Sequence, residues 1–147
     1  RNDELWFYYY GSKYRASSDY ARNSGSVRDP VSKERLLVDV GAICLAVLRR
    51  DGFISLDADK QAGEIQTKTF KLSGTKLFVN VDAPKGELRV EMLDGTGKIL
   101  AVSKPMQGDL LRGEVKWQKG NIADLKGNSA SLRFTLRNGQ FYSYWLE

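Results

Sequence analysis

The chain has 147 residues, of which 41% are hydrophobic and 28% are charged, and its formal net charge at pH 7 is +5. This composition is typical of one globular domain with its own core, and no apolar run is long enough to form a membrane-spanning helix. Histidine is absent and cysteine occurs once, which excludes imidazole catalysis, histidine-rich metal sites and an internal disulfide.

The first expected element is an aromatic strand, ELWFYYYG, which begins at Glu4. A second apolar strand, GAICLAVL, begins at Gly41 and contains Cys44, which we interpret as a packed core residue. Residues 11–40 between them are polar and rich in serine and arginine, and connections of this length are usually functional or disordered. We expect the two strands to pair with each other and to fold against the rest of the chain.

From about Phe53 onward the hydrophobic residues follow the two-residue period of half-buried strands. The runs KLFVNVD and ELRVEM each place their apolar residues on one side. The segment APKG lies between these runs, and its proline and glycine predict a turn that joins two separate strands.

The last two expected strands are SLRFTLR and FYSYWLE, which are joined through Asn138-Gly139. This dipeptide predicts a hairpin, because a type I′ turn needs positive φ at both central positions. The final strand is apolar on both sides, so we expect it to be central or covered on both faces. One side is predicted to hold Phe141 and Trp145, and the other Tyr142, Tyr144 and Leu146.

Several short strands without a convincing helix predict an all-β fold, an antiparallel β-sandwich of jelly-roll type with an N-terminal two-strand extension. The one stretch with helical character is NIADLKG, which allows at most a single turn ending at Gly127. We divide the chain into residues 1–58, the strand pair with its long polar loop, and residues 59–147, the β-sandwich domain.

Four stretches carry a resemblance to a known family: GAICLAVLRRDGFISLDA, GEIQTKTFKL, LFVNVDAPKGELRVEMLDGTGK and LRFTLRNGQFYSYWLE. Together they resemble the C-terminal end of secreted glycoside hydrolases of the β-fructosidase-like type, in which a five-bladed β-propeller carries the catalytic carboxylates and a β-sandwich follows. The most specific part is Leu48-Arg49-Arg50-Asp51-Gly52-Phe53. The resemblance implies that residues 1–58 correspond to the end of the last propeller blade and that the protein is secreted.

The function implied by this resemblance is that of a non-catalytic accessory module in a carbohydrate-active enzyme. Such a module binds a polysaccharide or oligosaccharide weakly, or supports the neighbouring catalytic domain of the same protein, and has no membrane partner. The alternative of a glycoside hydrolase fragment would require Asp51, Asp57 or Asp59, whose positions turn chemistry explains. We expect no cofactor; a structural calcium ion is the one metal considered, although these aspartates fit no calcium-loop template.

Aromatic rings are the candidate carbohydrate-binding groups, because flat rings stack on the apolar faces of sugars. They offer a large contact area and lose little conformational entropy on binding. Three candidates share one face of the first strand if it is regular, two lie in the polar loop, and one belongs to the run VKWQKG. Burial in a core competes with sugar binding for each ring. The candidates are Trp6, Tyr8, Tyr10, Tyr14, Tyr20 and Trp117.

The basic charge raises another alternative, a nucleic-acid-binding β-domain. Most lysines and arginines occupy alternate positions of expected strands, which indicates a solvated sheet face and makes nucleic acid the less favoured partner. The adjacent pair Arg49-Arg50 could bind an acidic polysaccharide. We favour a structural role, with one side chain inward, one outward, and Asp51 or Asp57 as a partner.

Overall fold

The structure is a computed structural model that describes residues 3–12 and 41–147. Its contacts divide the chain into two compact units, residues 1–48 and 49–147. This division falls earlier than the boundary at residue 58 that we placed from the sequence. The short strand β3 (Leu56–Ala58) pairs with β11 (Gly139–Leu146) inside the second unit. The polar loop with Tyr14 and Tyr20 lies outside the described residues.

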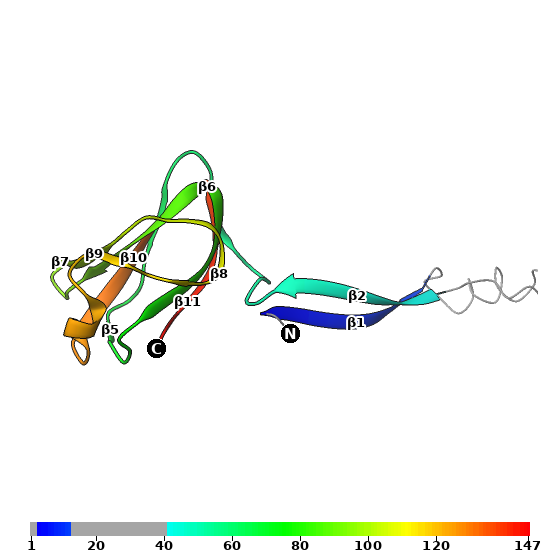
Figure 1. The fold of residues 1–147 in the computed structure, drawn as a ribbon, viewed down its shortest axis with the longest axis horizontal. Coiled ribbons are helices and arrows are strands. Elements are labelled where there is room, and N and C mark those ends of the chain that lie inside the picture. Colours follow the sequence, from blue (N-terminus) through cyan, green and yellow to red (C-terminus); the bar gives the residue numbers. More distant parts are fainter. Residues whose placement is uncertain (1–2, 13–40) are drawn as a thin grey trace, which may run out of the picture. The chain divides into compact units, whose positions relative to one another are not determined.

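In the first unit, β1 (Glu4–Ser12) and β2 (Gly41–Arg49) form a two-stranded sheet, drawn in blue and cyan in Figure 1. The predicted pairing of these strands is therefore confirmed. We call this two-stranded sheet the ribbon. Cys44 is half-buried in it, and its Sγ lies 3.1 Å from the position that a Cβ on Gly11 would occupy.

The second unit is one antiparallel sheet organised around the long strand β6 (Leu77–Leu93). The first part of β6 pairs with β11 on one edge and β8 (Met106–Glu114) on the other, and the second part pairs with β10 (Ser129–Arg137) and β7 (Ile99–Ser103). The remaining strands are β4 (Gly63–Gln66) and β5 (Phe70–Lys71), which pair with β10, and β9 (Trp117–Lys119), which pairs with β7.

The predicted turn at APKG is wrong, because β6 continues through this segment and bends there. Gly86 makes the bend possible: a Cβ at this position would lie 1.8 Å from the carbonyl oxygen of Arg137 and 2.3 Å from that of Asn138. Only a residue without a side chain allows β6 to approach the β10–β11 junction so closely. The first part of β6 therefore pairs with β11 and β8, and the second part mainly with β10 and β7.

The predicted hairpin at Asn138-Gly139 is wrong as well, since β10 and β11 pair one after the other with β6 and not with each other. Asn138 does adopt a positive φ of 47°, but Gly139 does not, whereas a type I′ turn needs both. The backbone N–H of Asn138 instead donates to the carbonyl oxygen of Asp59 at 2.7 Å. The dipeptide forms the corner that faces Gly86.

The predicted facing of the last strand also needs correction. The register between β11 and β6 shifts between Phe141 and Ser143, which leaves the intervening Tyr142 as an extra residue. Phe141 and Tyr144 therefore both contact Phe134, with ring centroids 4.8 and 5.1 Å apart. The expectation that β11 is a central strand is confirmed, because it lies between β3 and β6.

The core of the second unit is formed chiefly by alternate residues of β6 and by β10. The side chains of β6 that are fully buried there are Leu77, Val79, Val81, Ala83, Leu88, Val90 and Met92. The single helical turn expected at NIADLKG is a 3₁₀ helix, η1 (Ile122–Leu125), followed by Gly127 with φ of 87°. The predicted all-β antiparallel fold is confirmed. Within the described residues, no helix is both long and apolar enough to cross a membrane.

Candidate functional site

Three of the candidate sugar-binding rings lie on β1 of the ribbon. Trp6, Tyr8 and Tyr10 are exposed to 37%, 68% and 64%, and their spacing places them on one side of the strand. The ring centroids of Trp6 and Tyr8 are 6.4 Å apart, with planes inclined by 59°. This inclination means that the two rings do not form a single flat platform. The candidates Tyr14 and Tyr20 lie outside the described part of the chain.

The ribbon also exposes large apolar side chains between these rings. Tyr9 is 53% exposed, and it points to the side opposite Tyr8 because successive strand residues alternate. On β2, Ile43 is 83% exposed, and Leu45 and Val47 on the same side are exposed too. A sheet with one solvent-exposed face normally carries polar residues on that face. The ribbon therefore exposes apolar side chains on both of its sides.

The last candidate, Trp117, lies beside a polar hollow of about 210 Å³ in the second unit. Its ring is half-buried and packs against the hydrophobic core, so only part of it faces the hollow. Charged, amide and hydroxyl groups surround the ring, which is the mixture of groups that sugar-binding sites use. The lining residues are Thr75, Lys76, Glu114, Val115, Lys116, Trp117 and Asn121.

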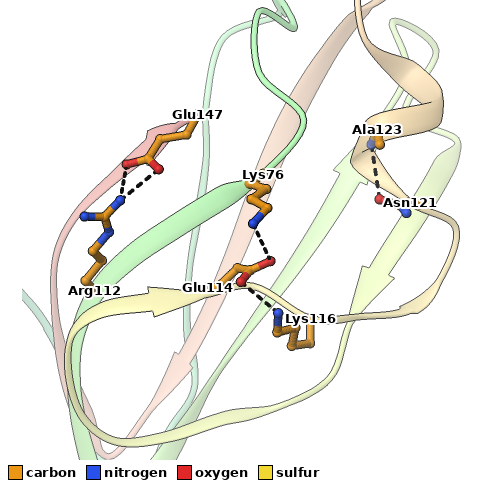
Figure 2. A network of polar contacts seen from close by, with 7 residues as sticks. All are labelled: Lys76, Arg112, Glu114, Lys116, Asn121, Ala123 and Glu147. Carbon is orange, nitrogen blue, oxygen red and sulfur yellow. Dashed lines mark hydrogen bonds and ion pairs between the residues drawn. The ribbon is translucent and has the colours of Figure 1, made fainter.

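Figure 2 shows how the charged groups of this hollow are arranged. Glu114 accepts a hydrogen bond from Lys116, with 2.8 Å between Nζ and the carboxylate oxygen, and Lys76 Nζ lies 4.0 Å from its other oxygen. The hydrogen bond from Lys116 is the main reason why the pKa of Glu114 is lowered, and the charges of Lys116 and Lys76 act in the same direction. The hollow thus holds a carboxylate between two ammonium groups at neutral pH.

Asn121 occupies the edge of the same hollow and caps η1 (Figure 2). Its Oδ1 accepts a hydrogen bond from the backbone N–H of Ala123 at 3.1 Å. That contact uses only the side-chain oxygen, so it leaves the amide N–H groups for other partners. Sequence reasoning singled out Trp117 but missed Asn121, Glu114 and the two lysines. Only folding brings Lys76, which precedes β6, to the end of β8 at Glu114.

A second polar cluster holds Glu147, also drawn in Figure 2. Its carboxylate accepts hydrogen bonds from Trp145 Nε1 at 3.0 Å and from Arg112 Nη2 at 2.7 and 2.8 Å. The hydrogen bond from Trp145, followed by that from Arg112, lowers the pKa of Glu147. The Arg112 guanidinium also lies 5.0 Å from the ring centroid of Phe78. These groups satisfy one another, which indicates a structural role.

The Arg49-Arg50 pair is largely engaged within the second unit. Arg49 donates two hydrogen bonds to Asn80 Oδ1, from Nε at 3.1 Å and Nη2 at 2.6 Å, and forms an ion pair of 3.0 Å with Asp109. Its guanidinium lies 4.1 Å from the ring centroid of Tyr142. For Arg49, the partners Asp51 or Asp57 considered from the sequence are therefore incorrect. The Arg50 guanidinium is 5.6 Å from the Trp145 ring centroid.

The three aspartates that a hydrolase would require each accept a hydrogen bond. Ser143 Oγ donates to Asp51 at 2.9 Å, Ser55 Oγ to Asp57 at 2.6 Å, and the Gln61 backbone N–H to Asp59 at 2.9 Å. The donors to Asp57 and Asp59 lie two positions away in the sequence, as is usual for aspartates at turns and strand ends, whereas Ser143 lies 92 positions from Asp51. Across residues 3–12 and 41–147, no group of three or more acidic, cysteine or histidine side chains is arranged to hold a metal ion.

Comparisons of the chain with protein-family models, with curated proteins and with solved structures found no match. Function therefore has to be inferred from the residues and from their geometry.

Proposed function

We propose that the chain is a non-catalytic accessory module of a secreted carbohydrate-active enzyme, and that the ribbon attaches it to a neighbouring catalytic β domain of the same protein. The observation that carries this proposal is the exposure of apolar side chains on both sides of the ribbon, seen most directly at Tyr8 and Tyr9. The resemblance of the sequence to the end of a propeller hydrolase supports the identity of the neighbour.

A protein partner accounts for this surface better than a sugar does. A glycan stacks on one side of a strand, and would leave the rings on the other side in water. Strands that are apolar on both sides are normally interior strands, covered above and below by other layers. A two-stranded sheet is also marginally stable by itself, and its outer edges can accept further strands. Addition of the ribbon to a larger sheet would satisfy both requirements.

The test compares the chain alone with the chain extended upstream through its adjoining coding sequence. We expect amide hydrogen exchange at Tyr8, Tyr9 and Tyr10 to slow by about a hundredfold or more in the longer protein, because docking adds a cooperative layer over the ribbon. Amides of β6 provide the internal control and should keep their exchange rates.

Equal exchange of the ribbon amides in both proteins would contradict attachment. So would an upstream coding sequence that specifies no β domain. Slow exchange of the ribbon in the chain alone, at the level of β6, would show that it needs no partner.

A second candidate function is weak glycan binding, and the hollow at Trp117 favours it. This site combines part of an indole ring with the carboxylate of Glu114 and the amide of Asn121. A few such contacts on a shallow surface support dissociation constants in the micromolar to millimolar range, which corresponds to about 4 to 8 kcal/mol. The exposed row of Trp6, Tyr8 and Tyr10 in the ribbon is a separate candidate contact for a glycan.

Affinity electrophoresis against β-fructans, xylans, arabinans and uronic polysaccharides tests this function. Asn121→Ser should weaken binding several-fold, since serine keeps the helix cap but lacks the amide N–H groups. Tyr8→Ala should also weaken binding, whereas Tyr9→Ala, on the opposite side of β1, is the matched control. Unchanged mobility with every polymer would leave only the attachment role. A steep decline of nucleic-acid binding with salt would instead favour the nucleic-acid alternative.

A further inference from the structure

The sheet of the second unit does not close, and its two ends flank an apolar cavity. β3 and β4 are the terminal strands of the sheet order, and in the described structure neither forms a ladder with the other although they follow each other in the chain. A cavity of about 220 Å³ lies along this seam. Its lining residues are Leu56, Asp57, Ala58, Gly63, Glu64, Ile65, Leu88, Phe134, Leu136 and Phe141. We propose that this seam cavity binds a small aromatic cation of about the size of benzylammonium.

The inner wall of the seam cavity is the hydrophobic core itself. Leu88, Phe134 and Phe141 are buried core residues, and the last two rings are stacked with centroids 4.8 Å apart. Water in such a place lacks hydrogen-bond partners, and apolar cavities of about 150 Å³ are known to take benzene. An aromatic ring beside Phe134 and Phe141 gains ring–ring contacts beyond the area that it buries.

The ends of β3 and β4 limit the size of the cavity. A Cβ on Gly63 would lie 3.6 Å from the Cβ of Ala58, which is ordinary contact, so the two strands approach closely at this end of the seam. Gly63 has no side chain that could fill the space in front of Leu136, with which it is paired in the ladder. At the rim, Leu56 and Ile65 are exposed apolar residues. The cavity therefore has an apolar entrance as well as an apolar interior.

The preference for a cation comes from the rim carboxylates. Asp57 forms no ion pair among the described residues; its oxygens accept from Ser55 at 2.6 Å and Gln140 at 3.4 Å. Glu64 lies 3.9 Å from Arg133, whose nearer partner is Glu91. Lys60, in the segment that joins β3 and β4, is exposed. Two weakly compensated carboxylates at the entrance thus attract a positive group, although exposed charges contribute modestly.

The test uses three ligands of one shape, benzylammonium, benzyl alcohol and benzoate, and follows backbone amide resonances of Ile65, Phe134 and Phe141. We expect saturable shifts with a dissociation constant on the order of a millimolar for benzylammonium, as suits a ligand of this size. Benzyl alcohol should bind about threefold more weakly and benzoate about tenfold more weakly, and added salt should reduce these differences.

Two kinds of variant separate the contribution of the ligand's ring to binding from the contribution of its charge. Ala58→Leu places a larger side chain in the seam and should abolish the saturable shifts for all three ligands. Asp57→Asn combined with Glu64→Gln should keep binding of benzyl alcohol but bring the three affinities within about twofold of one another. Asp124→Asn removes one exposed carboxyl of η1, outside the seam cavity, and is the control for loss of a negative charge elsewhere; it should leave the three affinities unchanged.

The proposal is overturned if the shifts grow linearly with each ligand without saturation, or if saturable shifts persist in Ala58→Leu with a folded spectrum. Equal affinity of the unaltered protein for benzylammonium and benzoate would overturn the cationic preference. Unfolding of Ala58→Leu would not decide the matter, so Gly63→Val provides the second filling variant, with the same expected loss.

Discussion

β1 of the ribbon and β6 of the folded sheet are both rich in apolar residues, yet their side chains have different surroundings. In β6 the residues of one side are fully buried, because strands pair with both of its edges and the sheet folds over them. In β1 consecutive residues such as Tyr8 and Tyr9 are both largely exposed. The contrast shows that an apolar run becomes core only where a second layer covers it.

The largest effect is expected at the corner of the sheet, in the variant Gly86→Ala. A Cβ there would lie 1.8 Å from the Arg137 carbonyl oxygen, so the two bent strands have to separate. We expect the free energy of unfolding to decrease by about 4 kcal/mol or more. Urea denaturation measures this, and Gly95→Ala is the matched control because a Cβ on Gly95 meets no atom within 4 Å. A loss of less than about 1 kcal/mol would contradict the role of this corner.

A smaller loss of stability is expected in the variant Asn80→Ala, which removes the buried hydrogen-bond partner of Arg49. Asn80 is fully buried, accepts two hydrogen bonds from Arg49, and donates one of 2.6 Å to the Arg50 carbonyl oxygen. Its removal leaves these groups without their partner, which should reduce the free energy of unfolding by about 2 to 4 kcal/mol. Asn128→Ala, at an exposed position before β10, should change it by less than about 0.5 kcal/mol.

This second prediction has a further check in the double variant Asn80→Ala with Arg49→Ala. The two residues contact each other directly, so the combined loss should be smaller than the sum of the single losses. Additive losses would show that the hydrogen bonds between them contribute nothing to the stability of the second unit.

The stability of the second unit should also decrease in acid, because Glu147 becomes protonated. The hydrogen bonds from Trp145 and Arg112 favour the carboxylate, so the pKa of Glu147 in the folded protein lies below the ordinary value of 4.5. The stabilisation is therefore complete above about pH 4.5 and is lost as the pH falls through the lower, folded pKa. Urea denaturation between about pH 6 and 3 should show a steeper loss for the natural protein than for Glu147→Gln.

The carboxyl resonance of Glu147 provides the direct measurement of this pKa. An NMR titration in the folded protein should give a midpoint below 4.5. A midpoint at or above that value, or identical pH profiles for the natural protein and Glu147→Gln, would contradict the stabilising contact. Asp124→Asn serves as the control for removal of one exposed carboxyl group.

The smallest effect is expected in the ribbon, and it tests the other side of the comparison. Tyr9→Ser removes an exposed ring that lies outside the core of the second unit, so the free energy of unfolding of that unit should change by less than about 0.5 kcal/mol. Phe141→Ala removes a buried ring and should reduce it by about 3 to 5 kcal/mol. Denaturation followed by the ellipticity of the sheet measures both. A loss above about 2 kcal/mol in Tyr9→Ser would mean that the two regions unfold as one.

Sequence patterns located the strands well, because alternation in runs such as residues 77–81 and 88–92 reflects which side chains meet the core. Connections were harder to predict. APKG and Asn138-Gly139 contain residues that are typical of turns, but in this fold they allow β6 to pass close to the β10–β11 junction. The contact between residues 86 and 138 joins distant parts of the chain, so no local sequence pattern predicts it. The bulge at Tyr142 changes which side chains of β11 face the core, and it too was not predictable from the local sequence pattern.

The candidate site could be predicted only in part. Tyr8 and Tyr10 are exposed although they belong to an apolar run, and composition alone does not reveal this. Trp117 was identifiable as an aromatic among polar residues, but its partial burial depends on packing against the core. Lys76, Glu114 and Asn121 come from separate segments, so only the folded chain shows that they share one hollow.

Cys44 provides an experimental opportunity, since it is the chain's single thiol and it lies half-buried in the ribbon. A maleimide fluorophore will react at one known position without any engineered attachment point. Its labelling rate and emission will then report whether the ribbon is covered, while β3 to β11 contribute no background because they contain no sulfhydryl group.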